Sequence, residues 1–484
     1  MVSLKNTNWL GAALLSVTLP GCMLTPSPES LPTIDETMGL ERYFSDRSSA
    51  VESVQTSEWW IQVGGANLDA MVETLRRDSL TLKEARLQAE QALLSAKIAG
   101  GQRLPSVLAF SDISTSRAPD FTGDFSWSEA YSAGLLLDFD TDIFGRLRAT
   151  QRAAQLNAIA SQLVISATEQ REIAALAKNY VSASALERRL ALANRTAESF
   201  RATYDLTNQR YAGGSEAVSA SDVQIALQNL ETALVDIPQI ETDLAKQFLI
   251  IDEQLARSPG ETQSSYKGSA IPYSHFSISP GRPASLLASR PDVAAAELRY
   301  LAALEDIGAA RTSLYPAMAL SASLSFQGDT PNDVFDWDRY ISSLASSLTA
   351  PVFQGGRIRR QIQVEEARAD ELANAFARTM HAAVIDVELA LSDLTGLEAQ
   401  RDQLNAALKT ARLSNELAQG RYQQGLASLL SVLETQRSLN AAEQNLILTE
   451  QAILNARIDL FLSLGGDWSD MPVAVQADPT RKSL

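Results

Sequence analysis

The feature that most constrains the fold is residues 146–212, a long stretch that contains neither glycine nor proline. Small and apolar side chains recur there in heptad-like steps of three and four residues: Ala153, Leu156, Ala160, Leu163, Ala167, Ala174, Ala177 and Val181. This spacing predicts a continuous helix that packs closely in a coiled coil. From Arg146 to Arg210 such a helix extends over about 100 Å. A helix of that length spans a distance and does not belong to a compact core.

The chain carries this unit twice. Three pairs of positions match at a shift of 211 residues: Leu104-Pro105 with Tyr315-Pro316, Gly145-Arg146 with Gly356-Arg357, and Arg210-Tyr211 with Arg421-Tyr422. The second copy has its own heptad-like series: Leu372, Phe376, Met380, Ala383, Val387, Ala390, Leu394 and Leu397. The period is far longer than that of a solenoid repeat. The sequence therefore predicts a duplicated unit with one long helix in each copy.

Each long helix is preceded by a region with period-two alternation. Residues 131–140 and 317–326 alternate most cleanly between apolar and other side chains, and 106–114 and 340–349 complete a set of four predicted strands. The loops at 117–125 and 327–337 would join them into two hairpins. Strands of about ten residues suit a membrane-crossing barrel with a watery lumen. Alternation alone equally suits two soluble hairpins that bury one face on a core.

Four strands cannot close a barrel within one chain. In a bilayer the open edges would leave backbone groups without hydrogen-bond partners. Strands in the membrane therefore require several copies of the chain. Two copies give eight strands, a barrel barely wider than its own side chains, and three copies give twelve.

After each long helix the chain reverses direction within a few residues, at 212–218 and 423–427. Glycines stand in both reversals, and we expect them to adopt the positive φ that a tight helix reversal needs. They are Gly213, Gly214 and Gly425.

Composition excludes several classes of function. Aromatic residues make up only 6% of the 484 residues, which favours long helices over a large mixed core. The formal net charge of -17 argues against a nucleic-acid partner, which requires a basic stripe. The two histidines, His275 and His381, are far apart and predict neither a metal site nor a general base. No phosphate-binding or dinucleotide-binding motif is found, so we expect no enzyme, no cofactor and a partner that supplies the energy.

The N-terminus predicts a lipoprotein signal. An apolar run from Trp9 to Leu19 follows Lys5 and is too short to span a bilayer as a helix, but it fits a signal peptide. It ends in Leu19-Pro20-Gly21-Cys22, which resembles a bacterial lipobox and makes Cys22, the chain's only cysteine, the candidate for lipidation. A single cysteine forms no intrachain disulfide. The alternative is an ordinary signal peptide with an incidental cysteine.

Several stretches together resemble the TolC-like family, the outer-membrane channels of tripartite efflux pumps, and in particular its lipidated branch serving drug exporters. They are 59–92, 286–326 with Arg290-Pro291-Asp292, 350–359 and 421–437, and they reach from about 58 to 468. The resemblance implies a homotrimer with a twelve-stranded outer-membrane β-barrel that continues into a periplasmic α-helical coiled-coil tunnel. It also implies contact with outer-membrane lipid, a periplasmic adaptor (membrane fusion protein) and an inner-membrane pump of the RND type.

The resemblance also assigns roles near the two reversals. The reversals would be periplasmic tips, where Gly213, Gly214 and Gly425 meet the adaptor. The implied gate consists of Leu430 as an apolar constriction, Glu434 where the family usually has Asp, Arg437 on the same helical face, and Tyr422 on the neighbouring helix. Without the family match, Glu434 and Arg437 make a solvated surface pair.

The predicted fold class is mainly α with a β-barrel part, built from a duplicated helix–hairpin–long helix unit. Its predicted segments are 1–21 signal peptide, 22–103 first helices, 104–257 first repeat (barrel hairpin 105–141, tunnel helices 146–257), 258–284 connector, 285–468 second repeat (316–351 and 357–464) and 469–484 tail. The predicted function is a passive exit duct for small molecules in the outer membrane. The alternatives are the outlet of a type I protein secretion system and a non-conducting periplasmic coiled-coil scaffold.

Overall fold

The computed structural model describes residues 58–119, 123–266 and 290–464. Signal peptide 1–21, Cys22, His275, the tail and most of the predicted connector lie outside these ranges. The described chain forms two compact units, and each draws on both copies of the repeat. The strand unit contains residues 96–154 and 301–370, and the helical unit contains the described parts of 58–95, 155–300 and 371–464.

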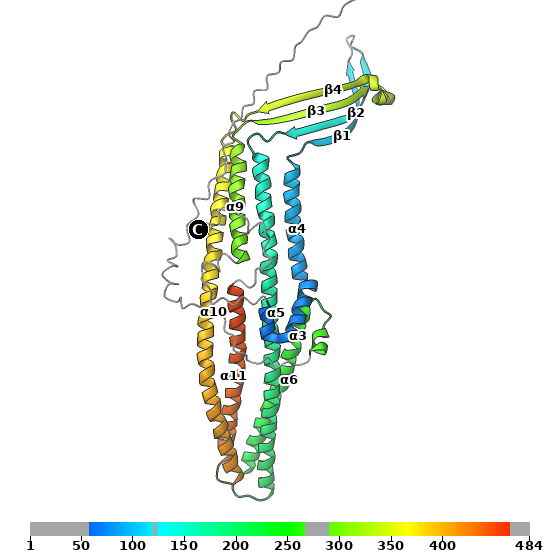
Figure 1. Cartoon of the computed structure of the whole chain (residues 1–484). Coiled ribbons are helices and arrows are strands. Elements are labelled where there is room, and N and C mark those ends of the chain that lie inside the picture. Colours follow the sequence, from blue (N-terminus) through cyan, green and yellow to red (C-terminus); the bar gives the residue numbers. More distant parts are fainter. Residues whose placement is uncertain (1–57, 120–122, 267–289, 465–484) are drawn as a thin grey trace, which may run out of the picture. The chain divides into compact units, whose positions relative to one another are not determined.

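The helices of the two copies match in length. They are α3 (Trp59–Asp78), α4 (Leu80–Gly101), α5 (Arg146–Ala212), α6 (Ala220–Gln254) and α7 (Glu261–Ser265), then α9 (Pro291–Thr312), α10 (Arg357–Gln423) and α11 (Leu429–Ser463) (Figure 1). Helices α4 and α9 have 22 residues each, α5 and α10 have 67, and α6 and α11 have 35. The predicted duplication and the predicted long helices are confirmed. Within the described ranges, no helix has the length and apolar character needed to cross a membrane.

The four strands form one antiparallel sheet in the order β1-β2-β3-β4. Their bounds are Ser106–Pro119 for β1, Phe125–Asp140 for β2, Ala317–Gly328 for β3 and Tyr340–Thr349 for β4. Strands β2 and β3 pair with each other, so the hairpins of the two copies make a single sheet (Figure 1).

The predicted loop at 117–125 is too long, because strand pairing continues into it. Arg117 of β1 pairs with Trp127 of β2, and Pro119 pairs with Phe125. The Arg117 guanidinium lies over the rings of Phe125 and Trp127, at 5.3 and 5.8 Å from their centroids. These cation–π contacts stabilise the end of the hairpin.

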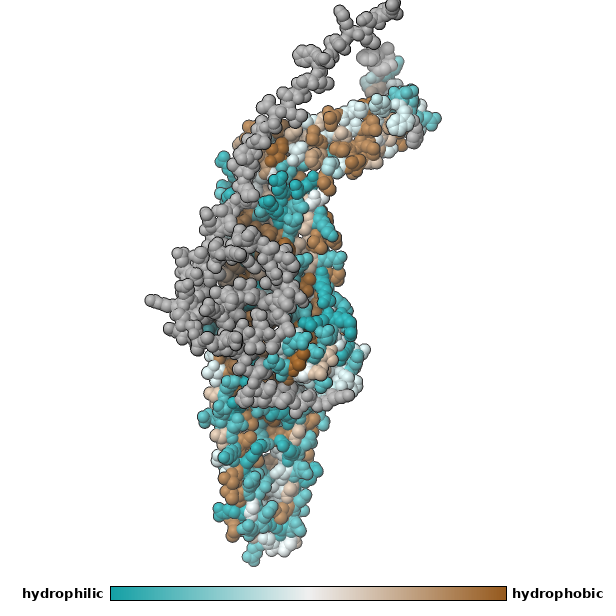
Figure 2. Space-filling view, in the orientation of Figure 1, coloured by the Kyte–Doolittle hydropathy of each residue, from teal (hydrophilic) through white to brown (hydrophobic). Residues whose placement is uncertain are grey.

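The register separates an apolar face of the sheet from a polar one. Val107, Leu137, Ala322 and Leu344 lie side by side across the four strands. The adjacent row, on the more polar opposite face, runs from Leu108 and Leu136 to Ser323 and Ser343, whose hydroxyl groups are hydrogen bonded at 2.7 Å. Among the described residues nothing covers this apolar face at Leu344, which is 80% exposed. Figure 2 shows hydrophobic residues gathered over the strands.

The helical unit has its main core where α3 packs against α5, α6 and α11. Trp59 and Trp60 of α3 lie there with Tyr180 of α5, Phe248 of α6 and Ile458 of α11. A second apolar cluster joins α5, α6, α10 and α11 near the two reversals. This second cluster positions the side chains that the sequence assigns to the gate.

The described part of the predicted connector is tied to α6 by a buried carboxylate. Asp252 accepts hydrogen bonds from the N–H groups of Gly260 and Thr262, at 2.7 and 2.8 Å. These bonds satisfy orphan donors at the start of α7.

Candidate functional site

The two reversals end their long helices with the same hydrogen bonds. The N–H of Gly214 donates to the carbonyl of Tyr211 at 3.0 Å, and that of Ser215 donates to Arg210 at 3.1 Å. In the second copy Gly425 donates to Tyr422 at 2.9 Å, and Leu426 donates to Arg421 at 2.8 Å. This pair of bonds, spanning three and five residues, defines the Schellman motif. The two motifs lie 211 residues apart, which is the shift between the matching positions of the two repeat copies.

Two of the three predicted turn glycines adopt a positive φ. Gly214 has φ +74° and Gly425 has φ +77°, a conformation that favours glycine. The prediction that Gly213 adopts a positive φ is wrong. Gly213 is not among the positive-φ residues of the described chain, and its N–H continues the helical pattern to Gln209. In the second copy Gln424 stands at the equivalent position, so the turn needs no glycine there.

The following helices begin at equivalent serines. Ser219 caps α6 in a full capping box, because its hydroxyl accepts from the Asp222 N–H and the Asp222 carboxylate accepts from the Ser219 N–H. Ser428 caps α11 by accepting from the Ser431 N–H at 3.4 Å, without a carboxylate in return. The reversals thus occupy 213–219 and 424–428, one residue later than the sequence predicts.

Tyr422 lies in the interior of the helical unit. Its side chain is 4% exposed and packs in the second cluster with Phe200 of α5 and Leu433 of α11. The Tyr422 and Thr207 hydroxyl groups are hydrogen bonded at 2.9 Å. Within one chain Tyr422 therefore fixes α10 against α5 and presents no surface to a channel.

Arg210 clamps the end of α10 from the end of α5. Its guanidinium donates to the carbonyl oxygens of Tyr422 and Gln423, at 2.7 and 2.6 Å. It also lies over the Tyr422 ring, 4.8 Å from the centroid. A cation at a helix C-terminus is favourable for the helix dipole. Sequence reasoning found Arg210 only as a marker of the repeat, because the repeat does not reveal which helix end lies beside it.

Arg437 does not pair with Glu434 within the chain. It donates from Nε and Nη2 to Oδ1 of Asn229 on α6, at 3.0 and 2.6 Å. Over the described residues no ion pair joins Glu434 to Arg437, so a surface pair between them in one chain is ruled out. Arg437 instead connects α11 to α6, and Glu434 is exposed.

A buried amide beside Arg437 makes the connection from α11 to α5. Gln436 donates from Nε2 to the hydroxyl oxygens of Ser199 and Thr203, at 3.0 and 2.9 Å. Leu430, about two turns nearer the reversal, is 65% exposed. Of the four predicted gate residues, Leu430, Glu434 and Arg437 are exposed on a single chain, and only Tyr422 is buried.

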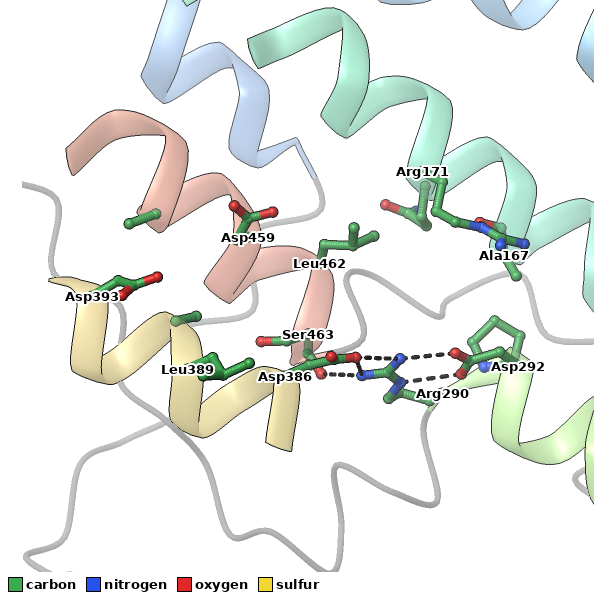
Figure 3. A pocket seen from close by; sticks show the side chains of 14 residues that line it. Ala167, Arg171, Arg290, Asp292, Asp386, Leu389, Asp393, Asp459, Leu462 and Ser463 are labelled. Carbon is green, nitrogen blue, oxygen red and sulfur yellow. Dashed lines mark hydrogen bonds and ion pairs between the residues drawn. The ribbon is translucent and has the colours of Figure 1, made fainter. Parts of the chain in front are cut away.

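A second polar site lies where α9 begins. Arg290 donates from Nε and Nη2 to the Asp292 carboxylate at 3.1 and 2.8 Å, and from Nη1 to Asp386 of α10 and to the carbonyl of Ser463 in α11 (Figure 3). Burial opposes ionisation of Asp292, but the hydrogen bonds and charge of Arg290 outweigh it, so the pKa of Asp292 lies below its ordinary value. Arg290 thus joins the start of α9 and the end of α11 to the middle of α10, a role that the sequence motif alone did not reveal.

The cavity at Arg290 has a volume of about 510 Å³, and Asp393 and Asp459 also line it. Throughout the described part of the chain, no group of three or more His, Cys, Asp or Glu side chains is arranged to hold a metal ion. The geometry supports a structural joint between helices.

The amino-acid sequence matches a known family. The family model described as outer membrane efflux protein matches residues 71–256 and 283–466. The chain belongs to the outer membrane efflux protein family. This membership confirms the family and the outer-membrane location that the sequence predicts, and the family consists of channel proteins rather than enzymes.

The relatives of this outer membrane efflux protein match it over nearly their whole length. It is 30% identical to the pyoverdine export outer membrane protein OpmQ of Pseudomonas aeruginosa, over 96% of this chain and 98% of that protein. It is 29% identical to outer membrane protein OprJ of the same species, over 95% and 96%. The solved structure of the outer-membrane channel OprN has the same fold, with a TM-score of 0.80, 24% identity and coverage of 88% of this chain and 96% of that one.

Proposed function

We propose that three copies of the chain form a passive exit duct through the outer membrane. The observation that carries this proposal is the sheet with two open edges. Among the described strands, β1 pairs with β2 alone and β4 pairs with β3 alone. Joining β4 of one copy to β1 of the next satisfies both edges, and three sheets of four strands close a barrel of twelve.

The two faces of the sheet suit this barrel. The row of Val107, Leu137, Ala322 and Leu344 would face outer-membrane lipid. Ser323 and Ser343 on the opposite face would line a watery lumen. Apolar-out and polar-in alternation is the pattern of transmembrane barrels.

The duct would receive its cargo from partners. In this proposal the reversals, with Gly213, Gly214 and Gly425, contact a periplasmic adaptor. An inner-membrane pump of the RND type supplies the energy for transport. Near full-length similarity to a pyoverdine exporter supports small-molecule cargo. Because the duct itself performs no energy-releasing reaction, cargo would be chosen upstream of it.

We place the resting gate at the reversals. Exposed Leu430 and Glu434 would face the axis, while Arg437 and buried Tyr422 hold their helices in position from behind. Cys22 would carry the lipid anchor in the outer membrane. Cys22→Ser should abolish labelling by palmitate but leave the barrel inserted, because a twelve-stranded apolar band outweighs acyl chains as an anchor.

Conductance measurement tests the duct. The purified chain should run as a heat-labile trimer and should form discrete single channels in a planar lipid bilayer. A matched pair of variants tests the orientation of the sheet. Leu344→Arg on the apolar face should destabilise the inserted barrel by about 2–4 kcal/mol, and Ser323→Arg on the other face should leave insertion intact and alter ion selectivity. Equal tolerance of both, or a trimer that conducts nothing, would contradict the proposal.

A further inference from the structure

Two exposed residues at the reversals have counterparts that are fully engaged in the same chain. Tyr422 is 4% exposed, and the equivalent Tyr211 is 47% exposed. Arg210 binds two carbonyl oxygens and covers the Tyr422 ring. The equivalent Arg421 is exposed, and its side chain has no partner among the residues that the structure describes.

The end of α5 offers the same acceptors as the end of α10. Both helices finish in the same Schellman motif, so the carbonyl groups of Tyr211 and Ala212 stand where those of Tyr422 and Gln423 stand in the second copy. Carbonyl groups in the last turn of a helix need partners from outside the helix. In the described chain no side chain donates to Tyr211 or Ala212 at the end of α5.

We infer that Arg421 clamps the end of α5 in a neighbouring copy, as Arg210 clamps the end of α10 in its own chain. Arg421 would donate to the carbonyl oxygens of Tyr211 and Ala212 of that copy and would cover its Tyr211 ring. The occupant of this surface is therefore a second copy of the chain. The inference rests on the proposed trimer, because a ring of duplicated chains brings the end of α10 beside the next α5 by the same rotation that relates α5 to α10.

One difference separates the two contacts. Within the chain the Tyr422 hydroxyl is paired with Thr207. The residue equivalent to Thr207 in the second copy is Ala418, which has no hydroxyl for Tyr211 of the neighbouring copy. The contact between copies thus keeps the arginine clamp but lacks the hydroxyl pair, and it is the weaker of the two.

Cross-linking between separate chains tests the contact. Two differently tagged chains, both in a Cys22→Ser background, would carry Tyr211→Cys and Arg421→Cys respectively. After co-expression and treatment with a short bismaleimide, we expect a covalent dimer that contains both tags. Chains that carry Arg210→Cys and Tyr422→Cys are the matched control and should give no mixed dimer, because that pair meets within one chain. Each single-cysteine variant, expressed alone, shows how much covalent dimer forms between two copies of the same position.

The outcomes separate this inference from the proposed function. A preparation that is trimeric by light scattering but gives no mixed dimer from positions 211 and 421 would overturn the clamp and leave the duct intact. A preparation that is monomeric would overturn the trimer and the clamp together. In a conducting trimer, Arg421→Ala should raise conductance at low salt, with partial return in Arg421→Lys. Unchanged conductance in Arg421→Ala would count against the clamp.

Discussion

The two reversals have the same backbone and different surroundings. Both end in a Schellman motif with glycine at a φ near +75°, and both are preceded by an Arg-Tyr dipeptide. Yet Tyr422 is buried between α5 and α11, while Tyr211 is exposed. Local sequence determines the backbone conformation of a turn. The helix that packs against the turn determines which of its side chains stabilise the fold. Changing equivalent positions in the two copies tests this comparison.

The largest difference is expected between the two tyrosines. Tyr422→Ala should destabilise the reversal by about 3–5 kcal/mol, because it opens a cavity and removes the hydrogen bond between Tyr422 and Thr207, whose hydroxyl then keeps only its bond to the Thr203 carbonyl. Tyr211→Ala should change the stability of the reversal in the dissociated chain by no more than about 0.5 kcal/mol. Amide hydrogen exchange over the two reversals measures the effect, since 1.4 kcal/mol is tenfold in the opening equilibrium. Similar losses of protection in both variants would show that burial does not separate the two sites.

Substitutions of the turn glycines should produce smaller differences in stability than those of the two tyrosines. Gly425→Ala and Gly214→Ala should each cost about 1–2 kcal/mol, because alanine disfavours the left-handed conformation. Gly213→Ala should cost less than either, since φ at that position is not positive and its counterpart is Gln424, although an added Cβ would lie 3.3 Å from the Gln209 carbonyl oxygen. The same exchange measurement applies. A cost for Gly213→Ala as large as that for Gly214→Ala would contradict the assignment of the turn.

The capping serines give the smallest expected difference. Ser219→Ala should cost about 1 kcal/mol, because a capping box with two reciprocal bonds is lost. Ser428→Ala should cost about 0.5 kcal/mol, since its single bond to Ser431 is long. Exchange rates of the first-turn amides of α6 and α11 provide the test. A larger effect at Ser428 would mean that the capping box contributes little to this reversal.

Most of the fold follows from local patterns in the sequence. Heptad-like spacing without glycine or proline predicts α5, since a helix of that kind needs no information from distant residues. Alternation places β2 and β3, whose apolar and polar faces the register confirms. The strand ends were less predictable. Arg117 extends β1 through its contacts with Phe125 and Trp127, and these contacts form only after the hairpin has closed.

The contacts of the candidate site do not follow from the sequence. Without the family resemblance, the sequence predicts a surface pair of Arg437 with Glu434, three residues away on the same helical face. It binds Asn229, 208 residues away in the sequence. Helical periodicity reports which residues share a face, but it carries no information on the side chain that another helix brings to that face. The same limit hid the role of Arg290, which joins three helices: the start of α9, the middle of α10 and the end of α11 (Figure 3).

The sequence by itself determined the duplication, the long helices, the strand alternation and the glycine-dependent turns, because each depends on residues close together in the chain. The tertiary structure alone decided which residues of the two equivalent Arg-Tyr dipeptides make contacts between helices of the chain. Arg210 contacts Tyr422 and Gln423 because α10 ends beside α5 in the same chain. Arg421 stands in the same Arg-Tyr dipeptide before the same backbone motif, but its side chain has no partner among the described residues. Burial and charge pairing arise between elements, and so only the packing of those elements settles them.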